Sequence, residues 1–228
     1  TPIGDLVRIF QDHSVDVYQV GSRNAENIGL LKALKLADVE VIYKNPMACT
    51  VQGWINMAGY LNPDKTTLCF RGKSADKDIS INARNSADLV ELVHLAQKSN
   101  LKCIYDPSHS TGLRDLVYSA SIAAISIGMD GLLVETHYNP ELAKTDGDQS
   151  ISLEQLEVLV KGIDAARQMY ENTGEFRERF AESAVQKYVM VYFKEKDETA
   201  IREQVALHGV KKHTEYTLPN GTQPQTIL

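Results

Sequence analysis

The sequence of 228 residues has no long hydrophobic run, few cysteines and no excess of positive charge. No apolar run approaches the roughly 20 residues that a membrane-spanning helix needs, and the first residues lack a signal-peptide pattern. The formal net charge is −6, which argues against a nucleic-acid partner and against an acidic membrane surface. We therefore expect a protein without nucleic-acid or membrane partners.

Only three cysteines occur, at Cys49, Cys69 and Cys103, and their spacing fits neither a disulfide framework nor a zinc site. Reduced thiols in a cytoplasmic protein are the simplest reading. The remaining composition is that of a globular protein, with 43% hydrophobic and 24% charged residues. The length suits one domain, or one domain with an appendage.

Five strand-like segments, each followed by a helical pattern, fill most of the chain. The strand-like segments are residues 15–21, 39–46, 66–73, 101–110 and 130–140. Ser86 is a plausible N-cap for the helix after the third strand, and Gly128 ends the helix after the fourth. Strands alternating with helices at this spacing predict an α/β fold, with a parallel sheet covered by helices.

Charged and imidazole side chains follow each of these strands. They are Arg23, Lys44, Arg71, Lys73, Asp106, His109, Glu135 and His137, with Asp146 in the loop after the last strand. Because ligands bind at the carboxyl ends of parallel strands, these residues are expected on one face. One charge at a strand end is commonly a solvated loop position, but five strand ends in succession indicate a site.

The residue types at this face indicate two kinds of ligand. Arg23, Lys44 and Arg71 supply convergent positive charge, which suits a phosphate or a carboxylate. His109, Glu135 and Asp146 form a mixed nitrogen and oxygen set that suits a divalent ion such as manganese, iron, cobalt or zinc. A metal beside a phosphorylated substrate would act as a Lewis acid on a carbonyl oxygen.

Five segments of the chain are specific enough to compare with known families: "QVGSRN", "YKNP", "CFRGK", "DPSHSTGLRDLV" and "GMDGLLVETHYNPELAKTDGDQSISLEQL". In this order and spacing they resemble the 3-deoxy-D-arabino-heptulosonate 7-phosphate (DAHP) synthase family, over about residues 15–171. The related KDO 8-phosphate synthases usually carry Asp-Ala-Thr-His where this chain has Asp-Pro-Ser-His, and they lack the Gly-x-Arg-Asn pattern of "GSRN". The resemblance therefore favours the DAHP branch, with a KDO 8-phosphate synthase-like enzyme as an alternative.

The resemblance implies a (β/α)8 TIM barrel that condenses phosphoenolpyruvate with erythrose 4-phosphate, with release of phosphate, as the first step of the shikimate pathway. A cytoplasmic homo-oligomer is expected. The implied substrate-binding residues are Arg23, Lys44, Arg71 and Arg114. The implied metal ligands are His109, Glu135 and Asp146, three of the family's four, and the implied catalytic residues are Lys44, His109 and Asp146.

Two family motifs are missing from this chain: Gly-Pro-Cys, whose cysteine is the fourth metal ligand, and Lys-Pro-Arg-Thr, which binds both substrates. By count, about five C-terminal βα units of eight are present, and the chain starts at Thr1 instead of Met, so we expect a fragment of a longer protein. Cys49 is a weak candidate for the missing ligand. Phe70 stands where many relatives have glutamate, which puts one supporting contact of the site in doubt.

Two domains are expected: a partial TIM-barrel catalytic domain over residues 1–173, and an extension over residues 174–228. The extension has helical, strand-like and again helical patterns between residues 175 and 209, then an extended stretch, and its role is unknown. A non-catalytic relative that binds a phosphorylated ligand or a partner subunit is the alternative to an enzyme. The 228-residue chain alone is expected to lack activity, because the missing motifs carry parts of the site.

Overall fold

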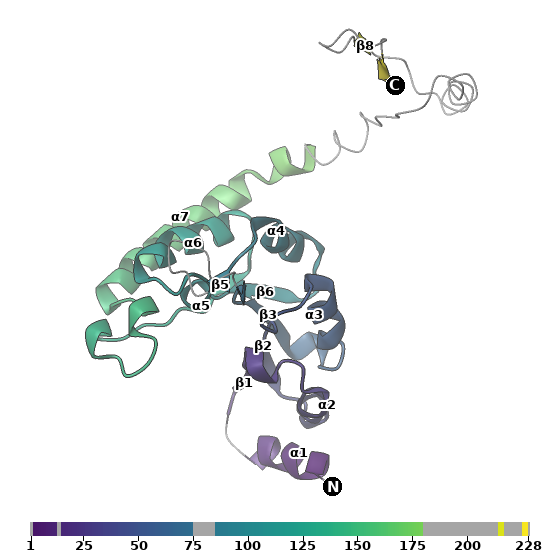
Figure 1. Cartoon of the computed structure of the whole chain (residues 1–228), viewed down its shortest axis with the longest axis vertical. Helices are drawn as coiled ribbons and strands as arrows, with labels where there is room; N and C mark the ends of the chain where they lie inside the picture. Colours follow the sequence, from purple (N-terminus) through teal and green to yellow (C-terminus); the bar gives the residue numbers. More distant parts are fainter. Residues whose placement is uncertain (1, 13–14, 75–84, 180–213, 217–224, 228) are drawn as a thin grey trace, which may run out of the picture. The chain divides into compact units, whose positions relative to one another are not determined.

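The computed structural model describes residues 2–12, 15–74, 85–179, 214–216 and 225–227. The chain divides into two compact units, Thr1–Asn172 and Thr173–Leu228. The first unit is built of alternating strands and helices (Figure 1).

The strands of the first unit are β1 (Val17–Val20), β2 (Glu40–Lys44), β3 (Thr66–Phe70), β4 (Lys73–Ser74), β5 (Asn85–Ser86), β6 (Lys102–Tyr105) and β7 (Gly131–Leu132). Its α-helices are α1 (Pro2–Asp12), α2 (Ile28–Ala37), α3 (Val51–Ala58), α4 (Leu89–Lys98), α5 (Pro107–Thr111), α6 (Arg114–Ser126) and α7 (Leu153–Asn172). Four short 3-10 helices join them: η1 (Ser22–Asn24), η2 (Pro63–Lys65), η3 (Pro140–Leu142) and η4 (Gly147–Gln149).

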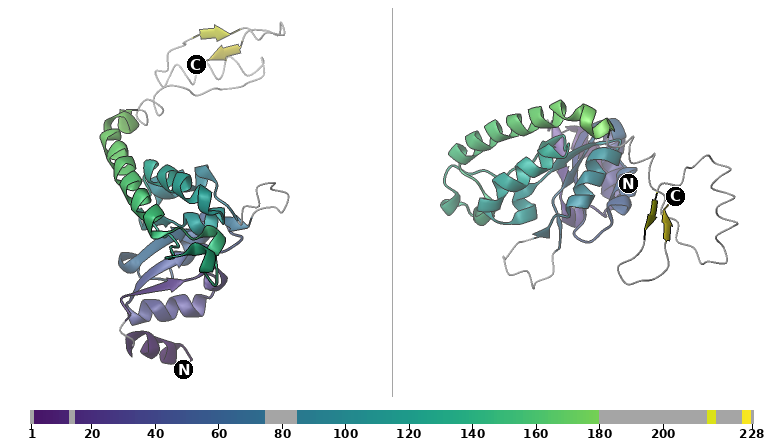
Figure 2. Two further views of the ribbon diagram at one scale, coloured as in Figure 1. Left: turned by 90° about the vertical axis from the view of Figure 1, so that its left-hand side faces the viewer. Right: turned by 90° about the horizontal axis from the view of Figure 1, so that it is seen from above.

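Five of these strands form one parallel sheet in the order β1-β2-β3-β6-β7. The prediction of five βα units with a parallel sheet is therefore confirmed. Helices lie along the strands from α2 beside β1 and β2 to α6 and α7 near β6 and β7 (Figures 1 and 2). Within the described residues β1 and β7 are the two edges of the sheet.

The two faces of the sheet differ because successive side chains of a strand point to opposite faces. One face packs against the helices and forms the main core, in which Tyr43, Leu68 and Phe70 are fully buried together with Trp54 of α3. The opposite face carries the side chains of alternate residues, such as Lys44 and its cross-strand neighbour Cys69. This second face thus carries Lys44, whose side chain is buried, at the carboxyl end of β2.

Three local expectations from the sequence are wrong. The fifth strand, β7, has only two residues, because its partner β6 ends at Tyr105. Beyond β7 the described residues contain one isolated β-bridge, between Thr136 and Ile151. The strand-like segment expected over residues 101–110 ends at Tyr105, and helix α5, which Asp106 caps, follows it. The N-cap of α4 is Asp88, not Ser86, since its side chain accepts hydrogen bonds from two backbone N–H groups of the first turn.

The described part of the second unit is small. Its two strands, β8 (Thr214–Tyr216) and β9 (Gln225–Ile227), pair in an antiparallel ladder. The helix and strand patterns expected between residues 180 and 209 lie outside the described residues, so they stay predictions. Across the described residues, no helix has both the length and the apolar character to cross a lipid bilayer.

Candidate functional site

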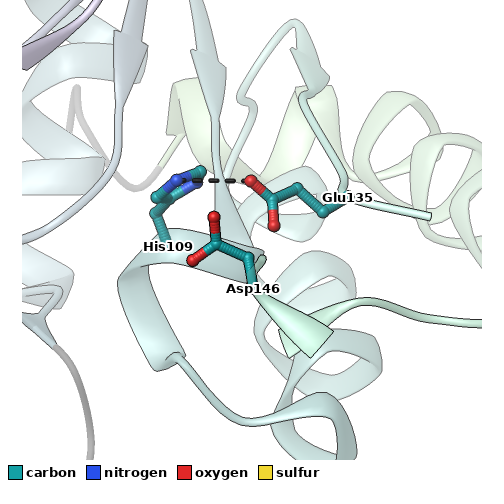
Figure 3. A group of neighbouring side chains, drawn as sticks. All are labelled: His109, Glu135 and Asp146. Atoms are coloured by element: carbon teal, nitrogen blue, oxygen red, sulfur yellow. Dashed lines mark ion pairs between the residues drawn. The ribbon is translucent and has the colours of Figure 1, made fainter. Parts of the chain in front are cut away.

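His109, Glu135 and Asp146 lie together at the carboxyl edge of the sheet. One ligand atom of each side chain lies within 4.8 Å of the others. Figure 3 shows the three side chains pointing toward one another, from helix α5, from the segment after β7 and from the loop before η4. We call these three residues, which form a candidate site for a single metal ion, the metal cluster.

Helix α5 positions His109 within this cluster. Asp106 caps the helix, its Oδ1 accepting a hydrogen bond of 2.9 Å from the backbone N–H of His109, and Pro107 occupies the first helical turn, where its missing N–H costs nothing. The ring Nδ1 lies 2.9 Å from Asp106 Oδ2, although the two are not aligned as a full hydrogen bond. The other ring nitrogen, Nε2, lies 3.3 Å from Glu135 Oε1.

Two hydrogen bonds fix Glu135. Its backbone N–H donates to the hydroxyl of Ser108, 3.0 Å away, and its Oε2 accepts from the side-chain amide of Gln149 at 2.9 Å. Both Ser108 and Gln149 are buried. Their contacts leave Oε1 as the oxygen that faces His109. Sequence reasoning predicted a supporting role for neither residue, although both lie inside the recognised "DPSHS" and "TDGDQS" segments.

Asp146 lies in a tightly folded loop between η3 and η4. Its backbone is left-handed, with φ 55° and ψ 28°, and its carbonyl accepts a hydrogen bond of 2.8 Å from the Ser150 hydroxyl. The next residue is Gly147, where a Cβ atom would lie only 2.8 Å from the carbonyl oxygen of Pro140. The close approach of these two backbone segments requires glycine.

The chemistry and spacing of the cluster fit a divalent metal ion. Neighbouring ligand atoms bound to one ion at about 2.1 Å lie about 3.0–3.4 Å apart, and opposite ones at most about 4.2 Å apart. The 3.3 Å between His109 Nε2 and Glu135 Oε1 is in this range, and the 4.8 Å limit of the set needs only a small closing movement. Two carboxylates and a ring nitrogen that converge in this way are stabilised by a cation between them.

Lys44 and Asp106 form a buried ion pair beside the metal cluster. The Lys44 ammonium lies 2.7 Å from Asp106 Oδ2, the same oxygen that faces the His109 ring. Burial by itself raises the pKa of the Asp106 carboxyl, but the contacts with His109 and Lys44 outweigh burial and lower that pKa overall. Asp106 is therefore held as a carboxylate that serves both neighbours.

Arg71 follows β3 and is also buried. Its backbone N–H donates to the side chain of Asn45 at 2.8 Å, and its Nη1 donates to the side-chain oxygen of Asn85 at 3.2 Å. The amide nitrogen of Asn85 in turn donates to the carbonyl of His109 at 2.6 Å. Gly72 has φ 77°, and a Cβ atom added there would lie only 2.9 Å from the Ser86 carbonyl oxygen, so the position favours glycine. Asn85 thus connects Arg71 to the metal cluster, a link that sequence reasoning missed.

The other predicted cations lie in different surroundings. Arg23, in η1 after β1, is exposed. Because β1, β2 and β3 are neighbours in a parallel sheet, the cations at their carboxyl ends lie at adjacent positions. We call these cations, Arg23, Lys44 and Arg71, the cation row. Lys73 pairs with Glu91 of α4 instead. Arg114 contacts the loop that holds Asp146. No observation tests the predicted role of Arg114 in substrate binding, which stays a prediction.

None of the three cysteines joins the metal cluster. All three are free thiols, and burial raises the pKa of each thiol, which disfavours the thiolate that binds metal. The weak expectation that Cys49 replaces the missing ligand has no support in the described residues. Phe70 points into the core, with its ring centroid 6.2 Å from that of Trp54.

Comparison with solved structures gives the class of fold. A truncated 3-deoxy-D-arabino-heptulosonate 7-phosphate synthase from Thermotoga maritima aligns with a TM-score of 0.62 at 31% identity, over 76% of this chain and 63% of that chain. A crystal structure of the Thermotoga maritima phospho-2-dehydro-3-deoxyheptonate aldolase aligns with a TM-score of 0.64 at 33% identity, over 71% of this chain and 47% of that one. The sheet is therefore part of a (β/α)8 TIM barrel.

The family follows from the sequence profile of the DAHP synthetase I family, which matches residues 7–171. The chain belongs to this family. It is 36% identical to the phospho-2-dehydro-3-deoxyheptonate aldolase of Thermotoga maritima over 149 residues, which are 64% of this chain and 43% of that enzyme. A 2-dehydro-3-deoxyphosphooctonate aldolase of Citrobacter koseri is 27% identical over 176 residues, 71% of this chain and 60% of that enzyme. The chain thus spans less than half the length of the Thermotoga relative.

Proposed function

We propose that this chain carries part of the active site of a DAHP synthase. This part comprises metal ligands and some of the residues that bind phosphoenolpyruvate. The reaction would join phosphoenolpyruvate to erythrose 4-phosphate and release phosphate. The observation that carries this proposal is the metal cluster beside the buried cations Lys44 and Arg71, in a member of the DAHP synthetase I family. Relatives bearing that enzyme name support it.

The cation row would hold phosphoenolpyruvate. An ammonium has three donors, and Asp106 takes one donor of Lys44, so others remain for an anion. Arg71 offers a guanidinium fork that suits a phosphate, and Asn85 orients it through Nη1. Arg23 is exposed and adds positive charge at the next strand end. Together these residues would place the enol carbon toward the metal cluster.

The metal cluster would hold a divalent ion through His109 Nε2, a carboxylate oxygen of Glu135 and a carboxylate oxygen of Asp146. When bound, such an ion supplies Lewis-acid polarisation of an aldehyde oxygen. Asp106 and Gln149 would orient the histidine and the glutamate, as supporting residues commonly do at metal sites. Manganese, iron, cobalt and zinc all suit a mixed nitrogen and oxygen set.

The assembly and location of the protein belong to the same proposal. Closing a barrel around this sheet needs further strands beside β1 and β7, the edges of its described part. A homo-oligomer is proposed, and size-exclusion chromatography with light scattering would test it. The free cysteines fit a reducing compartment such as the cytoplasm.

The test is an assay of the full-length gene product with phosphoenolpyruvate, erythrose 4-phosphate and added Mn²⁺, following phosphate release. We expect turnover that chelation removes and Mn²⁺ restores. Arabinose 5-phosphate replaces erythrose 4-phosphate in a parallel reaction, and faster turnover with it would assign the protein to the KDO 8-phosphate branch. A folded, metal-loaded protein that turns over neither sugar phosphate would support a non-catalytic binding role. The 228-residue chain, assayed alongside, is expected to be inactive.

A further inference from the structure

We propose that Arg114 is a positioning residue that holds Asp146 in the metal cluster. The proposal deepens the proposed function, because it rests on the cluster being a metal site. Arg114 begins helix α6, directly after the short helix that carries His109. Its side chain therefore connects the segment of one metal ligand to the loop of another.

The guanidinium of Arg114 contacts the Asp146 loop at three points. Nε donates to the carbonyl of Ser150, and Nη2 donates to the carbonyl of Gly147, each at 2.7 Å. Nη1 donates to the carboxylate of Glu141, also at 2.7 Å. The two carbonyls belong to the residues that follow Asp146, and Glu141 lies in η3 before it. The contacts therefore span the loop on both sides of the ligand.

The backbone of Asp146 shows why such support is needed. Only two non-glycine residues in the described part of the chain have positive φ, Asp38 and Asp146. Asp38 ends helix α2, where a left-handed residue is a common cap. Asp146 ends no α-helix, and its conformation persists only if surrounding contacts hold it. Arg114 donates hydrogen bonds to the carbonyls of Gly147 and Ser150, which follow Asp146. Loss of these hydrogen bonds should let the Asp146 carboxylate move out of the metal cluster.

The same contacts argue against Arg114 as a substrate-binding residue. All three guanidinium nitrogens donate to the loop, which leaves two of the five N–H bonds for any other acceptor. A substrate phosphate would have to compete with three short hydrogen bonds. Lysine carries a single charged nitrogen and cannot reproduce these three hydrogen bonds from three separate nitrogens.

The experiment measures Mn²⁺ binding to the full-length protein by electron paramagnetic resonance titration, for the wild type, Arg114→Ala and Arg114→Lys. Supporting contacts of this kind are worth about 10- to 100-fold in metal affinity. We expect Arg114→Ala to raise the Kd for Mn²⁺ by that factor, and Arg114→Lys by about tenfold. At saturating Mn²⁺, the KM for each substrate should match that of the wild type.

Two variants serve as matched controls. Arg167 of α7 donates to the carbonyl of Met129 at 2.8 Å, and Met129 lies just before β7, in a different segment from the three residues of the metal cluster. Arg167→Ala therefore removes a similar arginine support without touching the Asp146 loop, and it should leave the Kd for Mn²⁺ unchanged. Glu141→Gln removes only the charge of an exposed partner and should change that Kd by less than about threefold.

The possible results separate the role of Arg114 from the proposed function. Unchanged Mn²⁺ affinity in Arg114→Ala, or a raised KM at saturating Mn²⁺, would overturn the positioning role. If Arg114→Ala does not melt cooperatively, Arg114→Lys carries the same measurement and the same criteria. A wild type that binds Mn²⁺ without turnover would refute the DAHP synthase activity only, with the positioning role still decided by Mn²⁺ affinity. A wild type that binds no Mn²⁺ would overturn both.

Discussion

The metal cluster and the cation row are neighbours, but the chain assembles them in different ways. The residues of the metal cluster, and most of the side chains that hydrogen-bond to them, come from one stretch of sequence, residues 106–150. They lie on short helices and loops within this stretch. The cation row is spread over three strand ends, between Arg23 and Arg71, and the order of the sheet brings its members to one edge. The first site depends on hydrogen bonds between segments of one stretch of the chain, and the second depends on the order of the strands in the sheet.

Asp106 joins the two regions. Its Oδ2 is 2.7 Å from the Lys44 ammonium and 2.9 Å from the His109 ring, and its side chain is fully buried. Asn85 makes a second connection, between the Arg71 guanidinium and the His109 carbonyl. Because of these links, a substitution in one region should also alter stability or ligand affinity in the other. The size of the effect should depend on whether a charged or a neutral group is lost.

The largest expected effect is that of Asp106→Asn. The substitution keeps the size of the side chain but leaves the buried Lys44 ammonium without a counter-charge, which typically costs about 3–5 kcal/mol. We expect the free energy of unfolding, measured by denaturant titration of the full-length protein, to fall by about that amount. The control is Asp38→Asn, since Asp38 pairs with Lys65 on the surface and such pairs contribute at most about 1 kcal/mol. Equal losses in both variants would show that the buried pair has no special role.

The next effect, His109→Ala, concerns the metal cluster alone. Removing a ligand should cost more than removing a supporting residue, so we expect the Kd for Mn²⁺ to rise by at least about 100-fold. Isothermal titration calorimetry on the full-length protein measures it. His94→Ala, on the exposed face of α4, is the matched control and should leave the Kd unchanged. Retained Mn²⁺ affinity in His109→Ala would mean that the cluster is not the metal site.

A smaller effect is expected in the cation row for Arg71→Ala. Losing a charge-assisted contact to a bound anion costs about 1.5–3 kcal/mol, so phosphoenolpyruvate should bind at least about tenfold more weakly. Arg8→Ala, at an exposed position of α1, is the control. A binding titration that gave the same phosphoenolpyruvate affinity for Arg71→Ala and wild type would remove Arg71 from the proposed substrate site.

Asn85→Ala has the smallest expected effect and tests the connection between the two regions. It removes a neutral hydrogen bond to the His109 carbonyl, worth about 0.5–1.5 kcal/mol, and a charge-assisted one from the Arg71 guanidinium, worth about 1.5–3 kcal/mol. Both phosphoenolpyruvate affinity and Mn²⁺ affinity should fall, by about three- to tenfold. Asn56→Ala, which loses only an exposed contact with Gln52, serves as control. A change in one affinity alone would show that Asn85 serves one region and does not couple them.

The sequence predicted the sheet better than the details at its edge. Alternating strand and helix patterns identified all five parallel strands, because hydrophobic periodicity depends on nearest neighbours along the chain. The same reasoning overestimated the fifth strand, since β7 ends where its partner β6 turns into α5. It also placed the cap of α4 at Ser86, whereas the helix begins after Asp88.

The candidate site was predictable in its residue types but not in its supports. The motifs around His109, Glu135 and Asp146 indicated a metal-binding set, and the structure brings the three together. The supporting contacts of Ser108, Gln149 and Asn85 could not be predicted, because a polar residue in a loop has many possible partners until the chain is folded. For the same reason the sequence could not show that Arg114 faces the Asp146 loop.

The parallel α/β pattern, the residue types at each strand end and the resemblance to one family could therefore be read from the sequence, since all three depend on local order along the chain. Which side chains share a partner became evident only in the folded chain. The pairing of Lys44 with Asp106 joins residues 62 positions apart, and the contact of Arg114 with Ser150 joins residues 36 positions apart. Such contacts form because a buried charge or donor needs a partner once water is excluded, and only the folded chain determines which partner is within reach.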